Sequence, residues 1–529
     1  MGTSALNPNR PTGEVSRGNR EVIEQRDPGT LNPGAEALRY SPAESARDIE
    51  ARLAEYSLGA SEVEGTEAIV LDLSGALRQV QATGREFRRA QEDYILAAIR
   101  LLMERHRWDP RFFNDTTIGV AGSGVDGRHE PALELINQLR ATKQLPFGGS
   151  VEAAWVFRAA ERLREEVTGT YRSSSELALS ASIPLMRGSG SVARESLIQS
   201  ERDLVYQARE FEDFRRRHLV DISGDYYNLL QSQAQIRNQE RQLESLDTFM
   251  RATQARFEAG RLSQFEVSIA QNQVLRARAS LAGLRESYIL QRDRFKIRLG
   301  LTIETPVVIR PLDFDIPPPE VTLEEATRLA MDYRLDLQNQ RDRLDDSRRG
   351  LRIAADALRP DLGFTARVGV PTDGGEVRGG LGFSPEEVTY SAGLTLSLPL
   401  DREIERLALR QSVIGVERSE RSLSEFTDGV ALSVRQAVRQ IDLARFQLRL
   451  AEEQVRINEK RLEEQKLKEA DVQPQQIVDT NNELLDAENA RDQARTSLRI
   501  AILNYLVESG QLRVSPDGTF EALPGMGED

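Results

Sequence analysis

The feature that most constrains the fold is a stretch from about Ser191 to Phe257 that contains no proline. A continuous helix over this stretch would be on the order of 100 Å long, because an α-helix rises about 1.5 Å per residue. A globular domain of ordinary size cannot contain such a helix. Apolar residues recur every seven positions here and in a second stretch, at Leu229, Ile236, Leu243 and Met250 and at Ile441, Leu448, Val455 and Leu462. This spacing is typical of coiled-coil seams and predicts a mainly α fold of long antiparallel helices.

Composition supports an elongated helical protein and excludes several function classes. The chain has 529 residues, of which 39% are hydrophobic and 29% charged, a balance that favours solvated helices over a thick core. Its net charge of −14 disfavours nucleic acid as a partner, because phosphate binding requires clustered Lys and Arg. It has no cysteine, which excludes disulfides and thiolate metal sites. No run of apolar residues is long enough to predict a membrane-spanning helix.

Short motifs recur in the same order in the two halves of the chain, which predicts an internal repeat. The recurring pairs are Leu73-Ser-Gly-Ala76 with Leu323-Glu-Glu-Ala326, Ser182-Ile-Pro184-Leu185 with Ser397-Leu-Pro399-Leu400, and Leu275-Arg-Ala277 with Leu485-Asp-Ala487. Each half reads as a shorter helix, a β hairpin, a very long helix, a turn and another helix. We therefore expect a first repeat at 48–312 and a second at 313–514, with a disordered N-terminal arm at 1–47 and a flexible C-terminal tail at 515–529.

The first repeat carries an insertion of about 35 residues in its hairpin region, near 113–170. The segment between Pro110 and Pro184 is longer by that amount than its counterpart between Pro360 and Pro399. Within the insertion we expect a short helix from Glu130 to Thr142. The sequence leaves open whether the insertion adds strands or covers the sheet.

The hairpins alternate apolar residues with small or polar ones. The alternating positions are Leu177, Leu179, Ala181 and Ile183, Leu362, Phe364, Ala366, Val368 and Val370, Leu394, Leu396, Leu398 and Leu400, and, less regularly, Val151, Ala153, Trp155 and Phe157. Such runs have the length that a tilted strand needs to cross a bilayer, although a soluble sheet with one buried face gives the same pattern. Four strands cannot close a barrel, for which about eight are needed, so lipid-facing strands would require several chains to share one barrel.

Four further motifs carry a resemblance to a known family. They are Tyr227-Asn-Leu-Leu230, Arg256-Phe-Glu-Ala-Gly260, Ala270-Gln271 and Leu299-Gly300. In this order they resemble the pattern of TolC-like outer-membrane efflux proteins, and the similarity extends over roughly Leu71 to Leu512.

The resemblance implies a homotrimer with a twelve-strand transmembrane β-barrel in the cell outer membrane, to which each subunit contributes four strands, and a long helical α-barrel in the periplasm. It implies a passive channel, an exit duct for efflux or secretion and not an enzyme, which works with a periplasmic adaptor (membrane fusion protein) and an inner-membrane transporter. No cofactor is expected, and no signal peptide is recognisable in the chain as given. The alternative function is a soluble periplasmic coiled-coil adaptor or scaffold protein.

Family members can carry two acidic residues per subunit on the helix after the second helical turn, where they form rings at the closed mouth. The resemblance puts Gln476 and Asp479 at these positions, so one acid is kept and one is replaced. Glu266 occupies the equivalent place in the first half. Three copies of Asp479 would attract cations at a constriction, whereas the plain alternative is a solvated helix carboxylate.

The turns between the long helices are candidate docking tips for an adaptor. Gly260 is expected to adopt a positive φ, with Arg261, Leu262 and Ser263 exposed beside it. At the second tip Ala470 stands where a glycine is expected and is followed by Asp471. No residues suggest catalysis, and the histidines at 106, 129 and 218 share no spacing that predicts a metal site.

Overall fold

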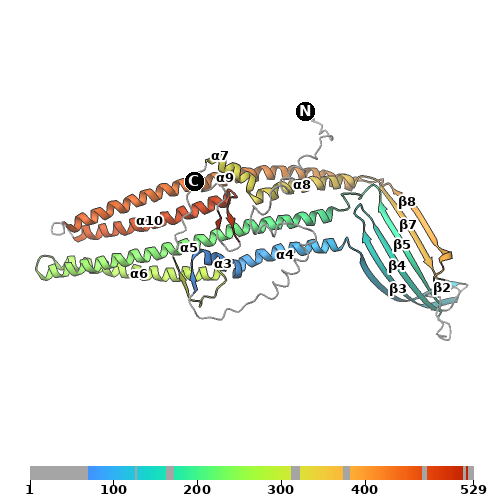
Figure 1. The fold of residues 1–529 in the computed structure, drawn as a ribbon, viewed down its shortest axis with the longest axis horizontal. Helices are drawn as coiled ribbons and strands as arrows, with labels where there is room; N and C mark the ends of the chain where they lie inside the picture. Colours follow the sequence, from blue (N-terminus) through green and yellow to red (C-terminus); the bar gives the residue numbers. More distant parts are fainter. Residues whose placement is uncertain are drawn as a thin grey trace, which may run out of the picture. The chain divides into compact units, whose positions relative to one another are not determined.

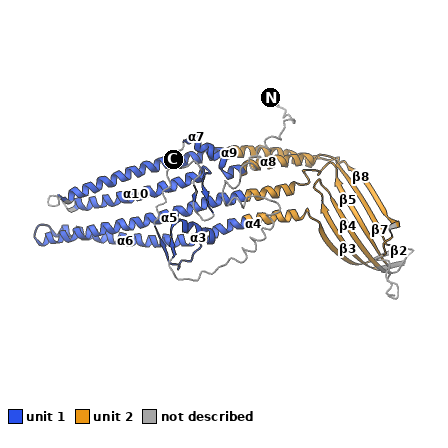
Figure 2. Ribbon diagram, viewed as in Figure 1, with its two compact units in different colours: residues 1–93, 208–338, 425–529 blue, residues 94–207, 339–424 orange. Residues whose placement is uncertain are grey.

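The computed structural model describes residues 69–125, 128–162, 172–310, 322–372, 382–467, 474–515 and 520–521. The chain divides into two compact units, shown in Figure 2. Unit 1 comprises residues 1–93, 208–338 and 425–529, and unit 2 comprises residues 94–207 and 339–424. The predicted arm at 1–47 lies outside the described residues, as do Ala470 and Asp471.

The helices of the two halves match in length and order (Figure 1). In the first half they are α3 (Leu73–Thr83), α4 (Arg85–His106), α5 (Glu195–Glu258) and α6 (Gln264–Arg298). In the second half they are α7 (Leu323–Tyr333), α8 (Leu335–Asp356), α9 (Glu403–Leu467) and α10 (Pro474–Glu508). The long helices α5 and α9 have 64 and 65 residues, which confirms the prediction from the proline-free stretch. In the part of the chain that the structure describes, no helix combines the length and the apolar character needed to cross a membrane.

Capping side chains define where the short helices begin. The Asp72 carboxylate accepts a hydrogen bond of 2.6 Å from the Gly75 N–H at the start of α3, and Thr322 plays the same part for Glu325 at the start of α7. A short strand precedes each of these helices in the chain: β1 (Ile69–Leu71) comes before α3, and β6 (Val307–Ile309) comes before α7. The two strands pair in parallel. The core of unit 1 lies around these elements and includes the fully buried residues Leu77, Leu219, Ile222, Tyr226, Tyr227, Phe295, Leu503 and Tyr505.

Near the C-terminus, β9 (Arg513–Val514) pairs with β10 (Phe520–Glu521). The strand β10 falls within the predicted tail at 515–529, of which the structure also describes Ser515. Residues 516–519 and 522–529 of that tail lie outside the described residues.

Unit 2 contains one six-stranded sheet in which every neighbouring pair is antiparallel. Its strand order is β2-β3-β4-β5-β7-β8 (Figure 1). The strands are β2 (Arg111–Val125), β3 (Arg128–Gln144), β4 (Ser150–Arg162), β5 (Arg172–Pro184), β7 (Asp361–Pro371) and β8 (Thr389–Ser397), and a short 3-10 helix, η4 (Pro385–Glu387), precedes β8. The alternating segments predicted from the sequence correspond to β4, β5, β7 and β8.

The prediction of four strands per subunit is wrong, because the insertion adds β2 and β3. The expected helix from Glu130 to Thr142 lies within strand β3 instead. Its apolar residues, Leu133, Leu135, Ile136 and Leu139, have a spacing that does not by itself separate helix from strand. Backbone pairing decides between them, because β3 has a strand partner on each side, β2 from Arg111 to Val125 and β4 from Ser150 to Arg162. The insertion therefore adds strands, which the sequence left open.

The register gives the sheet one apolar and one polar face. Directly paired residues share a face, and successive residues of a strand alternate between faces. The apolar face carries Phe112, Ile118, Val120, Leu133, Leu135, Leu139, Val151, Trp155, Phe157, Leu177, Leu179, Ile183, Leu362, Phe364, Val368, Tyr390, Leu394 and Leu396. Opposite it lies the polar face, which includes Asp115, Thr117, Arg140, Arg158, Glu176, Ser180, Ser182, Thr365, Arg367, Ser391, Thr395 and Ser397.

The apolar face is open to solvent. Among the residues of this six-stranded sheet whose side chains the structure describes, every exposed large hydrophobic residue lies on this face: Phe112, Ile118, Val120, Leu139, Leu177, Leu179, Val368, Tyr390, Leu394 and Leu396. Phe112 is 74% exposed and Tyr390 is 85% exposed. An apolar surface of this extent marks an interaction site for lipid or protein.

Candidate gate and docking tips

The first helical tip is a tight turn between α5 and α6, built around Gly260. The Gly260 N–H donates to the Phe257 carbonyl at 2.8 Å and the Arg261 N–H donates to the Arg256 carbonyl at 2.9 Å. Gly260 has a φ of 70°, which is the positive value predicted from the sequence. No heavy atom lies within 4 Å of the place where a Cβ would stand, so backbone conformation, and not space, favours glycine here.

The side chains around this turn form an exposed surface. Arg261 and Ser263 are exposed, as predicted, while Leu262 is half-buried. Next to them Phe265 is 73% exposed, a residue that the sequence reasoning missed. The sequence did contain a signal for this exposure. A phenylalanine that directly follows the turn at the end of a coiled coil has no apolar side chains of a neighbouring helix to pack against. This aromatic side chain makes the tip partly apolar.

Glu266 has a local structural role at the same tip. Its carboxylate accepts hydrogen bonds from the Ser263 N–H at 2.7 Å and from the Ser263 hydroxyl at 3.0 Å, and the first of these belongs to the capping box of α6. A carboxylate in the first turn of a helix is also stabilised by the helix dipole. Glu266 therefore fixes the start of α6, whether or not it also contributes to a gate.

Gln476 and Asp479 are exposed and lie in the first two turns of α10. Asp479 accepts a hydrogen bond of 2.8 Å from Gln475. The intervening Ile477 and Val478 are buried, and Val478 packs in one apolar cluster with residues of α5 and α6. This packing leaves Gln476 and Asp479 on the side of α10 that faces away from the apolar cluster.

A polar interface, which we call the α5–α10 seam, joins the two helical hairpins. It consists of Asn238, Arg241, Gln242 and Ser245 on α5 and of Asn481, Asn482, Glu488, Asn489 and Asp492 on α10. Asn238 is 4% exposed and donates to Asn489 at 3.0 Å and to Asp492 at 3.1 Å. Arg241 donates to Asn238 at 2.7 Å and pairs with Glu488 at 3.1 Å. Gln242 donates to Asn482 at 2.7 Å.

The contacts within each hairpin differ from the seam. Their polar pairs are more exposed, for example Arg285 with Glu240 at 2.6 Å between α6 and α5 and Arg461 with Glu483 at 2.5 Å between α9 and α10. Exposed pairs of this kind contribute little to stability. Each hairpin is held by its apolar seam, whereas hydrogen bonds between largely buried polar side chains connect α5 to α10, together with the apolar cluster around Val478. Because most side chains of the α5–α10 seam are polar, water can replace their hydrogen bonds when the hairpins move apart.

An ionic cluster in unit 1 ties the far end of α10 to α5 and α8. Glu508 accepts from Arg334 at 2.6 Å and from Arg217 at 2.9 Å, and Arg334 also binds Asp336 with two hydrogen bonds. Burial by itself would raise the pKa of Asp336 and Glu508, but the neighbouring arginines outweigh it and hold the pKa of each carboxyl below its usual value. This cluster anchors the C-terminal end of α10 to α5 at Arg217 and to the start of α8.

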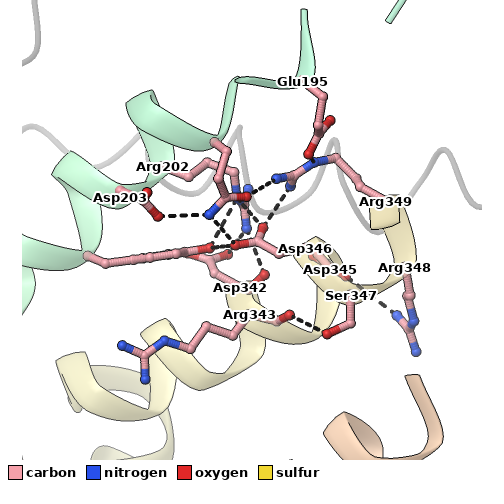
Figure 3. A network of polar contacts seen from close by, with 12 residues as sticks. Glu195, Arg202, Asp203, Asp342, Arg343, Asp345, Asp346, Ser347, Arg348 and Arg349 are labelled. Carbon is pink, nitrogen blue, oxygen red and sulfur yellow. Dashed lines mark hydrogen bonds and ion pairs between the residues drawn. The ribbon is translucent and has the colours of Figure 1, made fainter. Parts of the chain in front are cut away.

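A second ionic network in unit 2 connects α5 with α8, as Figure 3 shows. Asp346 lies at its centre, where it binds Arg202, Arg349 at 2.7 Å and the Tyr206 hydroxyl at 2.5 Å. Arg349 extends the network to Glu195 at 3.0 Å. Burial and the hydrogen bond to Asp346 raise the pKa of Tyr206, so its hydroxyl stays protonated and donates. The network fixes the first turns of α5 against α8, directly after the strands.

The chain combines an open apolar sheet face with two very long helical hairpins. The model of the outer membrane efflux protein family matches residues 128–297 and 327–502, more than half of the chain. The chain belongs to this family. No curated protein matches it by sequence.

Solved structures with a similar fold include outer-membrane proteins and channels. The VceC outer membrane protein from Vibrio cholerae is 14% identical, with a TM-score of 0.62 over 83% of this chain and 96% of that one. The CmeC outer membrane channel of Campylobacter jejuni is 14% identical, with a TM-score of 0.60 over 86% and 91%. The open state of the MtrE outer membrane channel of Neisseria gonorrhoeae is 13% identical, with a TM-score of 0.60 over 85% and 94%. At these identities the likeness establishes the fold.

Proposed function

We propose that three copies of this chain form a passive exit duct for efflux in the outer membrane, with the long helices in the periplasm. The observation that carries the proposal is the open apolar face of the sheet. In a soluble scaffold, the alternative from the sequence, this face would have to be covered, because exposed apolar patches of this size cause association. A lipid bilayer covers it in the duct, and the polar face then lines a water-filled interior.

The helical tips are the proposed docking site for a periplasmic adaptor that connects the duct to an inner-membrane transporter. The exposed Arg261, Ser263 and Phe265 at the first tip offer a cation, a hydroxyl and an aromatic ring. Aromatic and arginine side chains are the ones most often enriched in protein interfaces. Adaptor binding would supply the energy that separates the hairpins.

Opening would proceed through the α5–α10 seam. Its hydrogen bonds hold the two hairpins together in the closed state, and water can replace them once the hairpins move apart. Before opening, Asp479, on the exposed side of α10, would form a ring of three carboxylates at the closed mouth and favour cations there.

The conductance of detergent-purified protein in a planar lipid bilayer tests this function. We expect stepwise, cation-selective currents from the parent, and weaker cation selectivity from Asp479→Asn. Currents that the substitution leaves unchanged would support the duct and reject Asp479 as the selectivity ring. A protein that is soluble without detergent and gives no currents would favour the scaffold.

A further inference from the structure

The sheet of unit 2 ends in two strands that each have a single partner among the described residues. β2 pairs only with β3, and β8 pairs only with β7. Open edges present a row of unsatisfied backbone donors and acceptors, which in a bilayer cannot be met by water. Six strands are also too few to close a barrel by themselves. The edges therefore require strands from further copies of this chain.

Strand direction and side-chain parity both allow β8 of one copy to join β2 of the next. All five strand pairs are antiparallel, so the first and sixth strands of the sheet also run in opposite directions. A β8–β2 junction thus continues the antiparallel order of bacterial barrels. The open apolar face contains Phe112 of β2 and Leu396 of β8, so the junction can keep this face continuous.

The inserted β2–β3 hairpin continues the two faces of the sheet, and its apolar face also carries Asn137, which donates to Asn114 and Thr116. On the apolar face Ile118 pairs with Leu135 and Val120 with Leu133. On the polar face Asp115 and Arg140 form an ion pair of 3.1 Å, and the Arg140 guanidinium lies 4.9 Å from the centre of the Phe113 ring. A hairpin that covered the outside of a barrel or filled its interior would not need an apolar face aligned with that of its neighbours.

The turn that connects β3 to β4 is tightly built into the end of the sheet. The Leu145 N–H donates to the Gly149 carbonyl at 3.0 Å, and the Gly190 N–H donates to the Phe147 carbonyl at 2.8 Å. Gly149 has a φ of 84°, and a Cβ there would stand 2.0 Å from the Ser182 carbonyl oxygen of β5. Only glycine fits this close approach, so the turn fixes the hairpin as an integral part of the sheet.

We propose that the β2–β3 hairpin is part of the barrel wall and pairs with β8 of the neighbouring copy, so that the duct has an eighteen-strand barrel. Three copies of a six-stranded sheet give this number (3 × 6), in place of the twelve expected from the sequence. The inference rests on the proposed trimeric duct. Because barrel diameter grows roughly linearly with strand number, the opening at the membrane would be about 1.5 times as wide as that of a twelve-strand barrel.

Disulfide cross-linking tests the junction directly, because the chain contains no cysteine of its own. Thr117→Cys on the polar face of β2 is combined in turn with Ser391→Cys, Thr395→Cys and Ser397→Cys on the polar face of β8. A disulfide requires Cα atoms within about 7 Å, so a bond forms only between adjacent strands. The matched control replaces Thr117→Cys with Arg158→Cys, since Thr117 and Arg158 are both in register with Ile136 of β3.

We expect at least one Thr117→Cys pair to give covalent dimers and trimers on oxidation, and no Arg158→Cys pair to do so. Linkage through the Arg158→Cys pairs would overturn the eighteen-strand barrel, because β8 would then meet β4 in a twelve-strand barrel. Absence of linkage in both sets would also overturn the eighteen-strand barrel. In either case the proposed duct would stand if the protein still conducts, and it would be overturned if the protein gives no currents.

A deletion provides a second variant. Removing residues 111–144 makes β4 the edge strand while preserving the direction in which the chain enters the sheet. In this background we expect the Arg158→Cys pairs to become cross-linkable. If they stay unlinked in a deletion variant that still assembles, the edge assignment is wrong.

Discussion

Asn238→Ala should shift the duct toward its open state, because Asn238 lies at the centre of the α5–α10 seam. The substitution removes the hydrogen bonds to Asn489 and Asp492 and also the acceptor of Arg241. The side chain is 4% exposed, so water screens these bonds little in the structure.

The magnitude follows from the two bonds that cross the seam. A neutral hydrogen bond contributes about 1 kcal/mol and one to a carboxylate about 1.5–3 kcal/mol, and the open state recovers part of this through hydration. We therefore expect a net loss of about 2 kcal/mol per protomer for the closed state, which corresponds to a roughly 30-fold shift in the closed–open equilibrium.

Single-channel recording of the purified protein in planar bilayers measures this shift as the fraction of time spent in the highly conducting state. Asp247→Ala is the matched control on the same helix. It removes a contact of 3.3 Å with Arg278 that joins α5 to α6 within one hairpin and does not cross the seam.

Equal open fractions for Asn238→Ala, Asp247→Ala and the parent would refute the reasoning, provided that Asn238→Ala still assembles. A control that opened the duct as much as Asn238→Ala would show that any loosening of α5 suffices and that the seam has no particular role.

Three further predictions concern stability. Gly260→Ala should lower the free energy of unfolding by about 1 kcal/mol, because a positive φ is unfavourable for alanine. Chemical denaturation followed by circular dichroism measures this free energy, and an unchanged or raised value would contradict the prediction. Glu508→Gln should destabilise by about 2 kcal/mol at neutral pH, a value reduced for its partial exposure. The folded-state pKa of Glu508 is lowered, so the stabilisation by its carboxylate is complete above the usual carboxyl pKa and is lost as the pH falls through the lowered pKa. Thermal unfolding of the variant should therefore depend less on pH in the acid range than that of the parent. The same dependence of the melting temperature on pH in both proteins would contradict the assignment. His218 is buried and its pKa is lowered by that burial, so the parent should lose stability as the pH drops below about 6.5, and His218→Gln should remove this loss; a variant that kept the loss would assign it to another group.

Periodicity was sufficient to predict the elements that are regular over a long range. The proline-free stretch and its seven-residue spacing predicted α5 and α9, since a seam needs only the identity of residues on one helix. Period-two alternation likewise predicted β4, β5, β7 and β8. In each case the information lies within the element itself.

Strand β3 and the α5–α10 seam depend on partners distant in the chain, and the sequence predicted neither. Leu133, Leu135 and Leu139 allow a helix or a strand, and the pairing with β2 and β4 decides. Asn238 and Asn489 are ordinary polar residues of two helices until the fold brings them within 3.0 Å. The tip glycine could be predicted because its conformation is local, and the position of Phe265 directly after the same turn carried a signal for its exposure.

Electron cryo-microscopy of the full chain in lipid nanodiscs tests the central claim most directly. The account predicts three copies around one water-filled lumen, with the apolar face of each sheet against lipid and the helices extending on one side of the bilayer. A monomer, or an assembly whose apolar faces pack against one another away from lipid, would contradict it.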